Sequence, residues 1–346
     1  MTLTLAALAS KARDVWVPRW FDLFSDASGG FYERLDHNLM PINMPRRLVT
    51  QCRQIMVYSM ADRAKYQAKL DEAFAAMRAA YEVDSVPVFS TQDRYYDLYA
   101  LAFVLSACAA YNTEDARAYA DTILEFIQIN FAADIGFYDA LDLNLEPRSG
   151  IRRQNPHMHL LEGAMAMIEV SKDPGYRTLA DDMVALFLAR FFDGKNLYEF
   201  FDDDLRDPQN VVEAGHHAEW VWLLHRYQDL TGPDQRLQTA QTALYAWAKQ
   251  YGIDRDFGGV FNGQRVEGTV TDSSKRIWPQ MEMLRAAAIM QDEATVQNLL
   301  IVLNDYYFSD DGIWTESLKE DLSVDADYLP GTTPYHIYPV LKSIAA

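Results

Sequence analysis

A short glycine- and aromatic-rich element recurs six times along this chain, and this recurrence limits the possible folds more than any other feature. It is clearest in GGFYERL (29–35) and IGFYDAL (135–141). Aligned on one residue per copy, the element returns after 58, 48, 61, 62 and 54 residues; the aligned residues are Phe31, Phe89, Phe137, Tyr198, Val260 and Trp314. Between copies, apolar residues recur at three- and four-residue spacing, which indicates helices. Each step therefore has room for two helices of roughly 15 to 20 residues.

Six successive helical hairpins can stack as an open solenoid or close into a ring. The count of six favours closure, and no Pro- or Gly-rich linker divides the chain. Period-2 alternation, the pattern of β-strands, does not extend beyond a few residues. The sequence predicts an all-α fold: an (α/α)6 barrel of six helical hairpins with short β-hairpin loops, as one domain over residues 1–346. An open helical-repeat solenoid is the alternative.

The charge balance excludes several classes of partner. The chain has 50 Asp+Glu against 31 Lys+Arg, a net charge of −19, whereas nucleic acids and anionic membranes are bound by clustered Lys and Arg. The longest apolar run, 98–110, is too short to span a membrane. The apolar N-terminus does not resemble a secretory signal, because Lys11 and Arg13 follow it rather than precede it. We expect a cytoplasmic protein without nucleic-acid or membrane partners, in which Cys52 and Cys108 are buried thiols.

Most of the seven histidines lie at the starts of apolar helical stretches. NPHMHLLE (155–162) contains His159, GHHAEW (215–220) contains His216, and TPYH (333–336) ends on His336. A fourth segment, KRIWPQME (275–282), brings Trp278 and Glu282 to another helix start. Asn before Pro, as in the first segment, is typical of a helix N-terminus.

These placements predict a common site. If the four helices are the inner members of their hairpins, they run parallel, and their first turns open at the same mouth of the barrel. The positive end of each helix dipole lowers the pKa of a nearby imidazole and favours a developing anion. We therefore predict a site at which neutral histidines act as bases. His157, two positions from His159, faces elsewhere on the helix and is expected to be structural.

A metal centre is the alternative use of such a cluster. His157 and His159 have a spacing that suits a strand, but on a helix their side chains point apart. His216 and Glu219 share a helical face, a spacing that is compatible with a metal but weakly specific. The sequence contains no phosphate-binding glycine loop, dinucleotide fingerprint or serine nucleophile elbow. We predict no metal and no cofactor.

In this order and spacing, the four segments resemble the N-acylglucosamine 2-epimerase superfamily over nearly the whole chain. His159 matches a histidine of the aldose–ketose isomerases and cellobiose epimerases that the N-acylglucosamine epimerases generally lack. The Asn-Pro-x-Met-His form of residues 155–159 most resembles the mannose and sulfoquinovose isomerase branch. The resemblance implies the (α/α)6 barrel, a small-molecule sugar as substrate, and His216, His336 and His159 as catalytic residues. It also implies a set of substrate-contacting residues, namely Arg53, Tyr96, Asn155, Arg206, Glu219, Trp278 and Glu282. One departure is Leu98, where many members carry histidine.

The reaction implied by the resemblance is aldose–ketose isomerisation of D-mannose, or a similar aldose such as lyxose, through a cis-enediol. His336 is expected to take the C2 proton, and His216, oriented by Glu219, to open the ring and move protons; these two roles could be exchanged. A sugar 2-epimerase would use the same residues. A glycoside hydrolase would need two carboxylates, for which Glu219 and Glu282 are the candidates. A non-catalytic helical-repeat binding protein is the remaining alternative.

Overall fold

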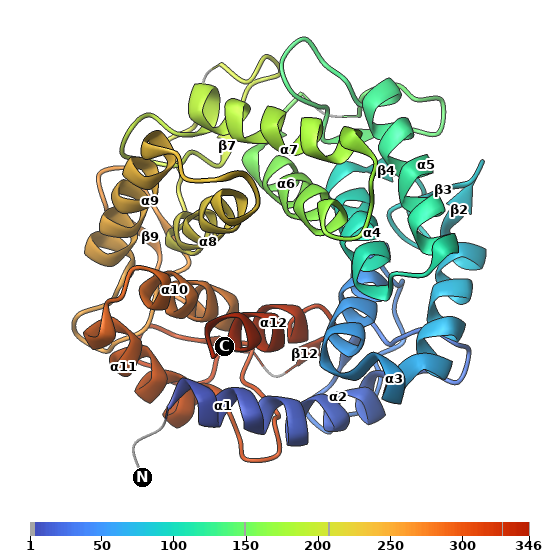
Figure 1. Ribbon diagram of the computed structural model, residues 1–346. Helices are drawn as coiled ribbons and strands as arrows, with labels where there is room; N and C mark the ends of the chain where they lie inside the picture. Colours follow the sequence, from blue (N-terminus) through green and yellow to red (C-terminus); the bar gives the residue numbers. More distant parts are fainter. Residues whose placement is uncertain (1–3, 149, 207, 327, 346) are drawn as a thin grey trace.

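The inner wall of the protein is a closed ring of helices (Figure 1). The computed structural model describes residues 4–148, 150–206, 208–326 and 328–345. Within these ranges six helical segments form the inner ring: the first part of α3 (Leu48–Tyr81), α4 (Leu98–Tyr111), α6 (Gln154–Ile168), α8 (Ala214–Thr231), α10 (Ile277–Ile289) and α12 (Pro334–Ile344). Each contacts the next, and α12 contacts α3, so the ring closes.

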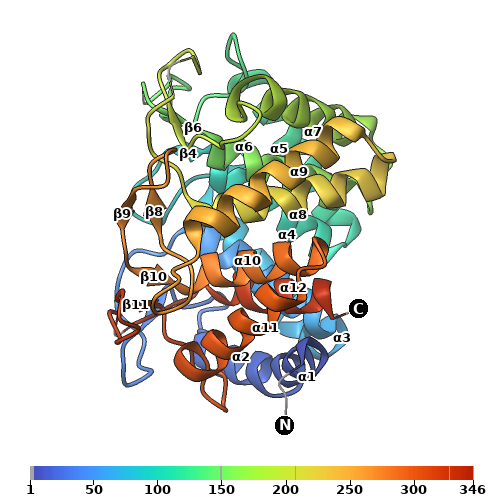
Figure 2. The ribbon, with the colours of Figure 1, turned by 90° about the vertical axis from the view of Figure 1, so that its left-hand side faces the viewer.

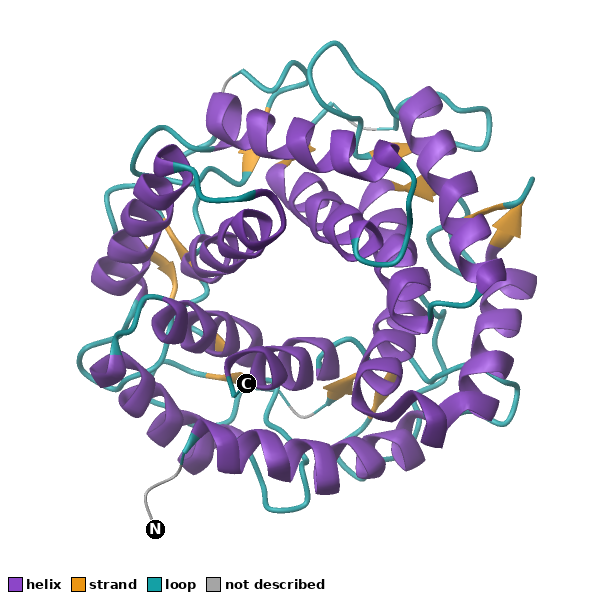
Figure 3. Ribbon diagram, viewed as in Figure 1, coloured by secondary structure: helices purple, strands orange, loops and turns teal. Residues whose placement is uncertain are grey.

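A second layer of helices surrounds the first (Figure 3). It is formed by α1 (Leu5–Lys11), η1 (Ala12–Trp16) and α2 (Val17–Phe24), the second part of α3, α5 (Glu114–Asn130), α7 (Pro174–Leu186) with η2 (Phe187–Phe191), α9 (Gln235–Trp247) with η3 (Ala248–Gly252), and α11 (Glu293–Val302) with η4 (Leu303–Tyr307). The predicted (α/α)6 barrel is thus confirmed and the open solenoid is not observed. Of the predicted span 1–346, residues 1–3, 149, 207, 327 and 346 lie outside the described residues.

Helix α3 contributes to both layers because it breaks at Asp62. The backbone angles of this residue, φ −161° and ψ 86°, are not helical. The Asp62 carboxylate accepts a hydrogen bond of 3.0 Å from the Lys65 backbone N–H, which caps the segment that follows. The break lets residues 48–61 line the inner wall while residues 63–81 return along the outside.

The inner and outer helices differ in burial, as their sequences require. Helix α4, LYALAFVLSACAAY, is buried on nearly every side, as expected for a helix that is apolar all round. Helix α5 is amphipathic and buries one face, including Ile123 and Ile127. Cys52 and Cys108 are free and buried, as predicted. None of the described helices combines the length and apolarity needed to cross a membrane.

Short antiparallel strands gather at one end of the barrel (Figure 2). Two pairs are local hairpins, β2 (Glu82–Val83) with β3 (Val86–Pro87) and β8 (Gly263–Gln264) with β9 (Val270–Asp272). In the other four pairs the two strands are separated by helices in the sequence: β1 (Arg34–Leu35) with β12 (Leu329–Pro330), β4 (Tyr96–Asp97) with β5 (Ala140–Leu141), β6 (Arg152–Arg153) with β7 (Phe200–Phe201), and β10 (Lys275–Arg276) with β11 (Ser317–Leu318). Because β4, β6 and β10 lead directly into α4, α6 and α10, the inner helices begin at this end.

One hydrogen bond recurs between the glycine-aromatic element and the inner helix twenty residues later. The backbone N–H groups of four such elements donate to four side chains: Phe31 to Gln51 (2.8 Å), Phe137 to His157 (3.0 Å), Leu197 to His217 (3.0 Å) and Val260 to Gln280 (2.7 Å). The fourth copy is therefore aligned on Leu197 and not on Tyr198. His157 and His217 replace glutamine as loop anchors, which confirms the structural assignment of His157.

Candidate active site

A cavity of about 200 Å³ lies where the inner helices begin. Ten described residues line it: Arg53, Tyr99, Asn155, His159, Glu213, His216, Glu219, Arg276, Trp278 and His336. They come from α3, α4, α6, α8, α10 and α12 and from the residues that precede α8 and α10. The structure thus brings together, in one place, the histidines and the indole that the sequence placed at separate helix starts.

His159 is held by a carboxylate one helical turn deeper. Its Nδ1 lies 2.8 Å from an oxygen of Glu162, and its ring packs against Phe103 and Tyr99. Burial lowers the pKa of His159, although the hydrogen bond to Glu162 opposes this shift. An ionised carboxylate can only accept, so Nδ1 donates. The lowered pKa favours the neutral form of His159, in which Nε2 carries a lone pair.

His336 has the same arrangement with a partner from another helix. Its Nδ1 lies 2.9 Å from Glu282, whose other oxygen forms an ion pair with Arg285. Burial lowers the pKa of His336 well below its ordinary value, and the positive charges of Arg53 and Arg285 act in the same direction. His336 is thus a neutral imidazole whose Nε2 can accept a proton.

His216 differs from the other two histidines in charge. Its Nδ1 lies 2.8 Å from Glu199 and 3.6 Å from Glu213, and its Nε2 lies 3.4 Å from the Asn155 amide nitrogen. Burial alone lowers the pKa of His216, but Glu199, Glu213 and Glu219 outweigh it and raise this pKa to about 10. One prediction is corrected, because Glu199 and not Glu219 contacts Nδ1 and orients the ring. The raised pKa favours the charged form of His216, whereas the sequence predicted neutral histidines.

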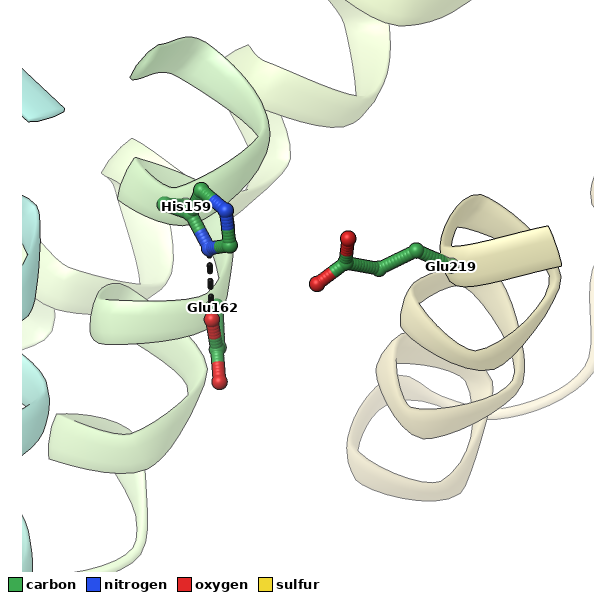
Figure 4. Close-up of side chains that lie close together, drawn as sticks. All are labelled: His159, Glu162 and Glu219. Atoms are coloured by element: carbon green, nitrogen blue, oxygen red, sulfur yellow. Dashed lines mark hydrogen bonds and ion pairs between the residues drawn. The ribbon is translucent and has the colours of Figure 1, made fainter. Parts of the chain in front are cut away.

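Glu219 lies at the floor of the cavity and points across it toward the His159–Glu162 pair (Figure 4). It is 1% exposed, and among the described residues neither of its oxygens has a hydrogen-bond partner. Burial raises its pKa well above the ordinary value, and the charge of Glu282 adds to the shift. A protonated Glu219 can donate a hydrogen bond to a ligand in the cavity.

The remaining predicted residues divide into two groups. Arg53 donates a 2.7 Å hydrogen bond to the Tyr99 hydroxyl, and its guanidinium lies over Phe103. Trp278 is near His216 and His336, with ring centroids 4.9 and 5.7 Å apart. These residues, with Asn155 and Glu219, line the cavity, whereas Glu282 acts on it through His336.

Tyr96 and Arg206 are placed elsewhere. The Tyr96 ring packs against Phe126 and its hydroxyl contacts the Val83 carbonyl oxygen at 3.4 Å. The Arg206 side chain is 65% exposed and lies 3.7 Å from Asp204. Neither is among the described residues that line the cavity. The tyrosine at the cavity is Tyr99, three residues further along.

Sequence reasoning missed two of the carboxylates that contact the histidines, Glu162 and Glu199, and named the third, Glu282, only as a substrate-contacting residue. Glu162 could have been found, because it follows His159 by three residues and shares its helical face. Glu199 carries a weaker signal: it is an acidic residue two positions after Leu197 in the glycine-aromatic element, as Glu33 is after Phe31 and Asp139 is after Phe137. Tyr335, whose hydroxyl donates to Glu162 from 173 residues away, carries no local signal.

Histidine and carboxylate atoms in this region approach within 4.8 Å of one another in three groups: His159, Glu162 and Glu219; Glu199, Glu213 and His216; and Glu219, Glu282 and His336. Such groups are close enough to share a cation. Each group also contains a histidine whose Nδ1 contacts a carboxylate, the arrangement that orients an imidazole for acid–base work. The same residues can therefore move protons with their Nε2 atoms facing the cavity.

An (α/α)6 barrel with two neutral histidines, one charged histidine and an indole at one end is equipped to transfer protons on a small molecule. Residues 30–339 match the N-acylglucosamine 2-epimerase (GlcNAc 2-epimerase) family. The chain belongs to this family.

Individual relatives carry the names of sugar isomerases and epimerases. The chain is 27% identical over 380 residues to a mannose-6-phosphate isomerase of Rhizobium meliloti (strain 1021), with 97% of this chain and 95% of the relative covered. It is 24% identical over 305 residues to a cellobiose 2-epimerase of Bacteroides fragilis, covering 77% and 76%. The solved structure of a D-mannose isomerase superposes with a TM-score of 0.88 at 20% identity, covering 98% and 96%.

Proposed function

We propose that this protein is a cofactor-independent sugar isomerase that interconverts D-mannose, or a similar aldose such as lyxose, with its ketose. One observation carries the proposal: three histidines, each with Nδ1 against a carboxylate, line one cavity together with an indole. The names of the mannose-6-phosphate isomerase and D-mannose isomerase relatives support the substrate class.

In the proposed reaction, neutral His336 and charged His216 carry out different proton transfers. His336, neutral, takes the C2 proton of the open-chain aldose with Nε2, which leaves a cis-enediolate; the proton on Nε2 exchanges with solvent, and His336 then delivers a proton to C1. His216, charged, gives a proton to the C1 oxygen and recovers one from the C2 hydroxyl, so no proton is gained or lost overall. The product is the ketose.

The other cavity residues bind and orient the sugar. Arg53 stabilises the oxyanion, because a fixed positive charge in a buried site acts on the charge that develops in the transition state. His159, Asn155 and Glu219 hold hydroxyl groups, and Trp278 offers an aromatic face to the apolar side of the sugar. Glu282 is a positioning residue for His336. Tyr96 and Arg206 have no role in this proposal.

A sugar 2-epimerase is the second candidate, and one observation favours it. Trp278 lies on α10, and the helices on either side of α10 in the inner ring carry His216 and His336. Two histidines on either side of a bound sugar could remove the C2 proton from one face and return a proton to the other. The product would then be the C2 epimer rather than the ketose.

Product analysis in deuterated water separates these outcomes. The purified protein is incubated with D-mannose, D-lyxose, mannose 6-phosphate, cellobiose or N-acetylglucosamine, with and without EDTA. We expect fructose from mannose, with deuterium at C1 and with the same rate in EDTA. Glucose with deuterium at C2 would establish the epimerase instead. Loss of activity in EDTA would reject the metal-free mechanism, and no conversion of any sugar would reject the proposed function.

A further inference from the structure

The internal repeat shows what is unusual about the environment of His216. In four of the hairpins, the residue two positions after the backbone N–H that donates the recurring hydrogen bond is followed, fourteen residues later, by the N-cap residue of the inner helix. These pairs are Glu33 and Arg47, Asp139 and Arg153, Glu199 and Glu213, and Asn262 and Arg276. Three inner helices therefore have arginine at the N-cap, whereas α8 has glutamate.

Where the N-cap is arginine, the loop side chain is bound to it. Glu33 accepts from the backbone N–H and the Nε of Arg47 at 2.9 and 2.7 Å. Asp139 accepts from the same two groups of Arg153 at 3.2 and 2.6 Å. The Asn262 side chain accepts from the Arg276 backbone N–H at 3.0 Å. The shared contact is structural, because it fixes the loop to the start of the inner helix.

At α8 this contact is replaced. Glu199 Oε2 contacts His216 Nδ1 at 2.8 Å and accepts from the Gln154 amide at 2.9 Å, and among the described residues its other oxygen has no partner. Glu213 Oε2 lies 3.6 Å from the same imidazole nitrogen. The positions equivalent to His216 in α3, α6 and α10 hold Thr50, Pro156 and Pro279, none of which titrates.

We propose that Glu213 is a positioning residue for His216. It occupies the N-cap position at which three other inner helices have arginine, so Glu199 is not bound by an arginine and can bind the imidazole. Glu213 also adds a second carboxylate beside the same ring. This inference deepens the proposed function and rests on it for its kinetic test. The groups that face His216 are Glu199, Glu213 and Glu219, with Asn155 from α6 and Trp278 from α10; Arg276 lies next to Glu213.

The substitution Glu213→Arg tests the proposal, because it restores the arginine found in the other hairpins. The new guanidinium is expected to draw Glu199 away and to repel the imidazolium. The pKa of His216 should then fall by about one unit or more, because both effects disfavour its charged form. The basic limb of the kcat/KM profile should move to lower pH by the same amount. Glu213→Asp should keep the limb within about 0.3 units of the wild-type position.

The control variant is Arg47→Glu, which makes the reverse exchange in a hairpin that has Thr50, and no histidine, at the position equivalent to His216. It should lower the melting temperature but leave the basic limb in place. A second readout, NMR titration of ¹⁵N-labelled histidines in the full chain, follows the His216 ring directly and needs no turnover.

The outcomes are distinct. Movement of both the limb and the NMR pKa in Glu213→Arg supports the proposal. A folded Glu213→Arg variant in which the NMR pKa is unchanged overturns it, as does an equal limb shift in Arg47→Glu. If no sugar is converted but the NMR pKa moves, the positioning role of Glu213 is supported and the proposed function is rejected.

Discussion

The two ends of the barrel are built from the same helices and carry different cavities. At the end where the inner helices begin, the cavity of about 200 Å³ is lined by histidine, arginine and glutamate side chains. At the end where they finish, a larger cavity of about 510 Å³ is lined mostly by apolar residues, among them Met56, Met165 and Ile289. Its charged residues form pairs with one another, such as Arg226 with Glu169. The size of a cavity therefore does not mark the site; the grouping of carboxylate-bound histidines does.

The two cavities are separated by a thin layer of buried polar residues. Glu162, Glu282, Arg285 and Tyr335 line the larger cavity, yet Glu162 and Glu282 reach through to the histidines of the smaller one. In the proposed function, one end supplies the reacting groups, and the contacts from the layer beneath it orient the histidine rings.

The largest expected difference between the two ends is the effect of removing a histidine. His336→Gln should lower kcat by about 10²–10⁴-fold, because a general base is lost. His225→Gln, at the far cavity, removes an exposed histidine that is 3.9 Å from Asp229 and should change kcat less than about twofold. Steady-state kinetics on circular-dichroism-verified folded variants measure both. Comparable losses in the two variants would break the comparison between the ends.

The dependence of kcat/KM on pH should reflect the different pKa values of His336 and His216. His336 must be neutral to accept a proton, and its lowered pKa places the acid limb below about pH 6.5, where activity falls tenfold per unit. His216 must be charged, and its pKa of about 10 places the basic limb there. The log of kcat/KM should be flat between these limbs. A basic limb near pH 7 would show that His216 is not held in its charged form.

Adding side-chain volume should change the kinetics at the histidine-lined cavity and not at the larger cavity. A Cβ at Gly215 would lie 2.6 Å from the Trp278 ring, so Gly215→Ala should displace the indole and raise KM by about tenfold, a loss of about 1.4 kcal/mol in binding. Ala166→Leu, which partly fills the larger cavity, should leave kcat and KM within about twofold. Unchanged kinetics in Gly215→Ala would remove Trp278 from the substrate site.

The smallest kinetic effect is expected at His217, although it adjoins His216 in the sequence. His217→Ala leaves the Leu197 N–H without its acceptor and should cost about 1–3 kcal/mol of unfolding free energy. His217→Gln should restore most of this, since Gln51 and Gln280 make the equivalent bond in other hairpins. Chemical denaturation gives the stabilities. A large loss of kcat in the stable His217→Gln variant would assign chemistry to this histidine.

The positions of some residues of the candidate site could be predicted from the sequence, and those of others could not. His159, His216, Trp278 and His336 all stand at helix starts, so their convergence follows once the helices are known to run parallel. Tyr96 lies one residue before the N-cap of α4, and the short strand β4 turns its ring outward. The carboxylate partners of the histidines come mostly from other elements, with 54 residues between Glu282 and His336.

The sequence by itself determined the six hairpins, the parallel inner helices and the segments that carry histidine, because helical period and repeat spacing are properties of the chain read in order. Only the tertiary structure decided which carboxylate holds which imidazole and which histidine is charged. The physical reason is that a pKa depends on burial and on charges within a few ångströms, and those neighbours are set by closure of the ring. His216 and His336 are the same residue type, and their surroundings raise the pKa of one and lower the pKa of the other.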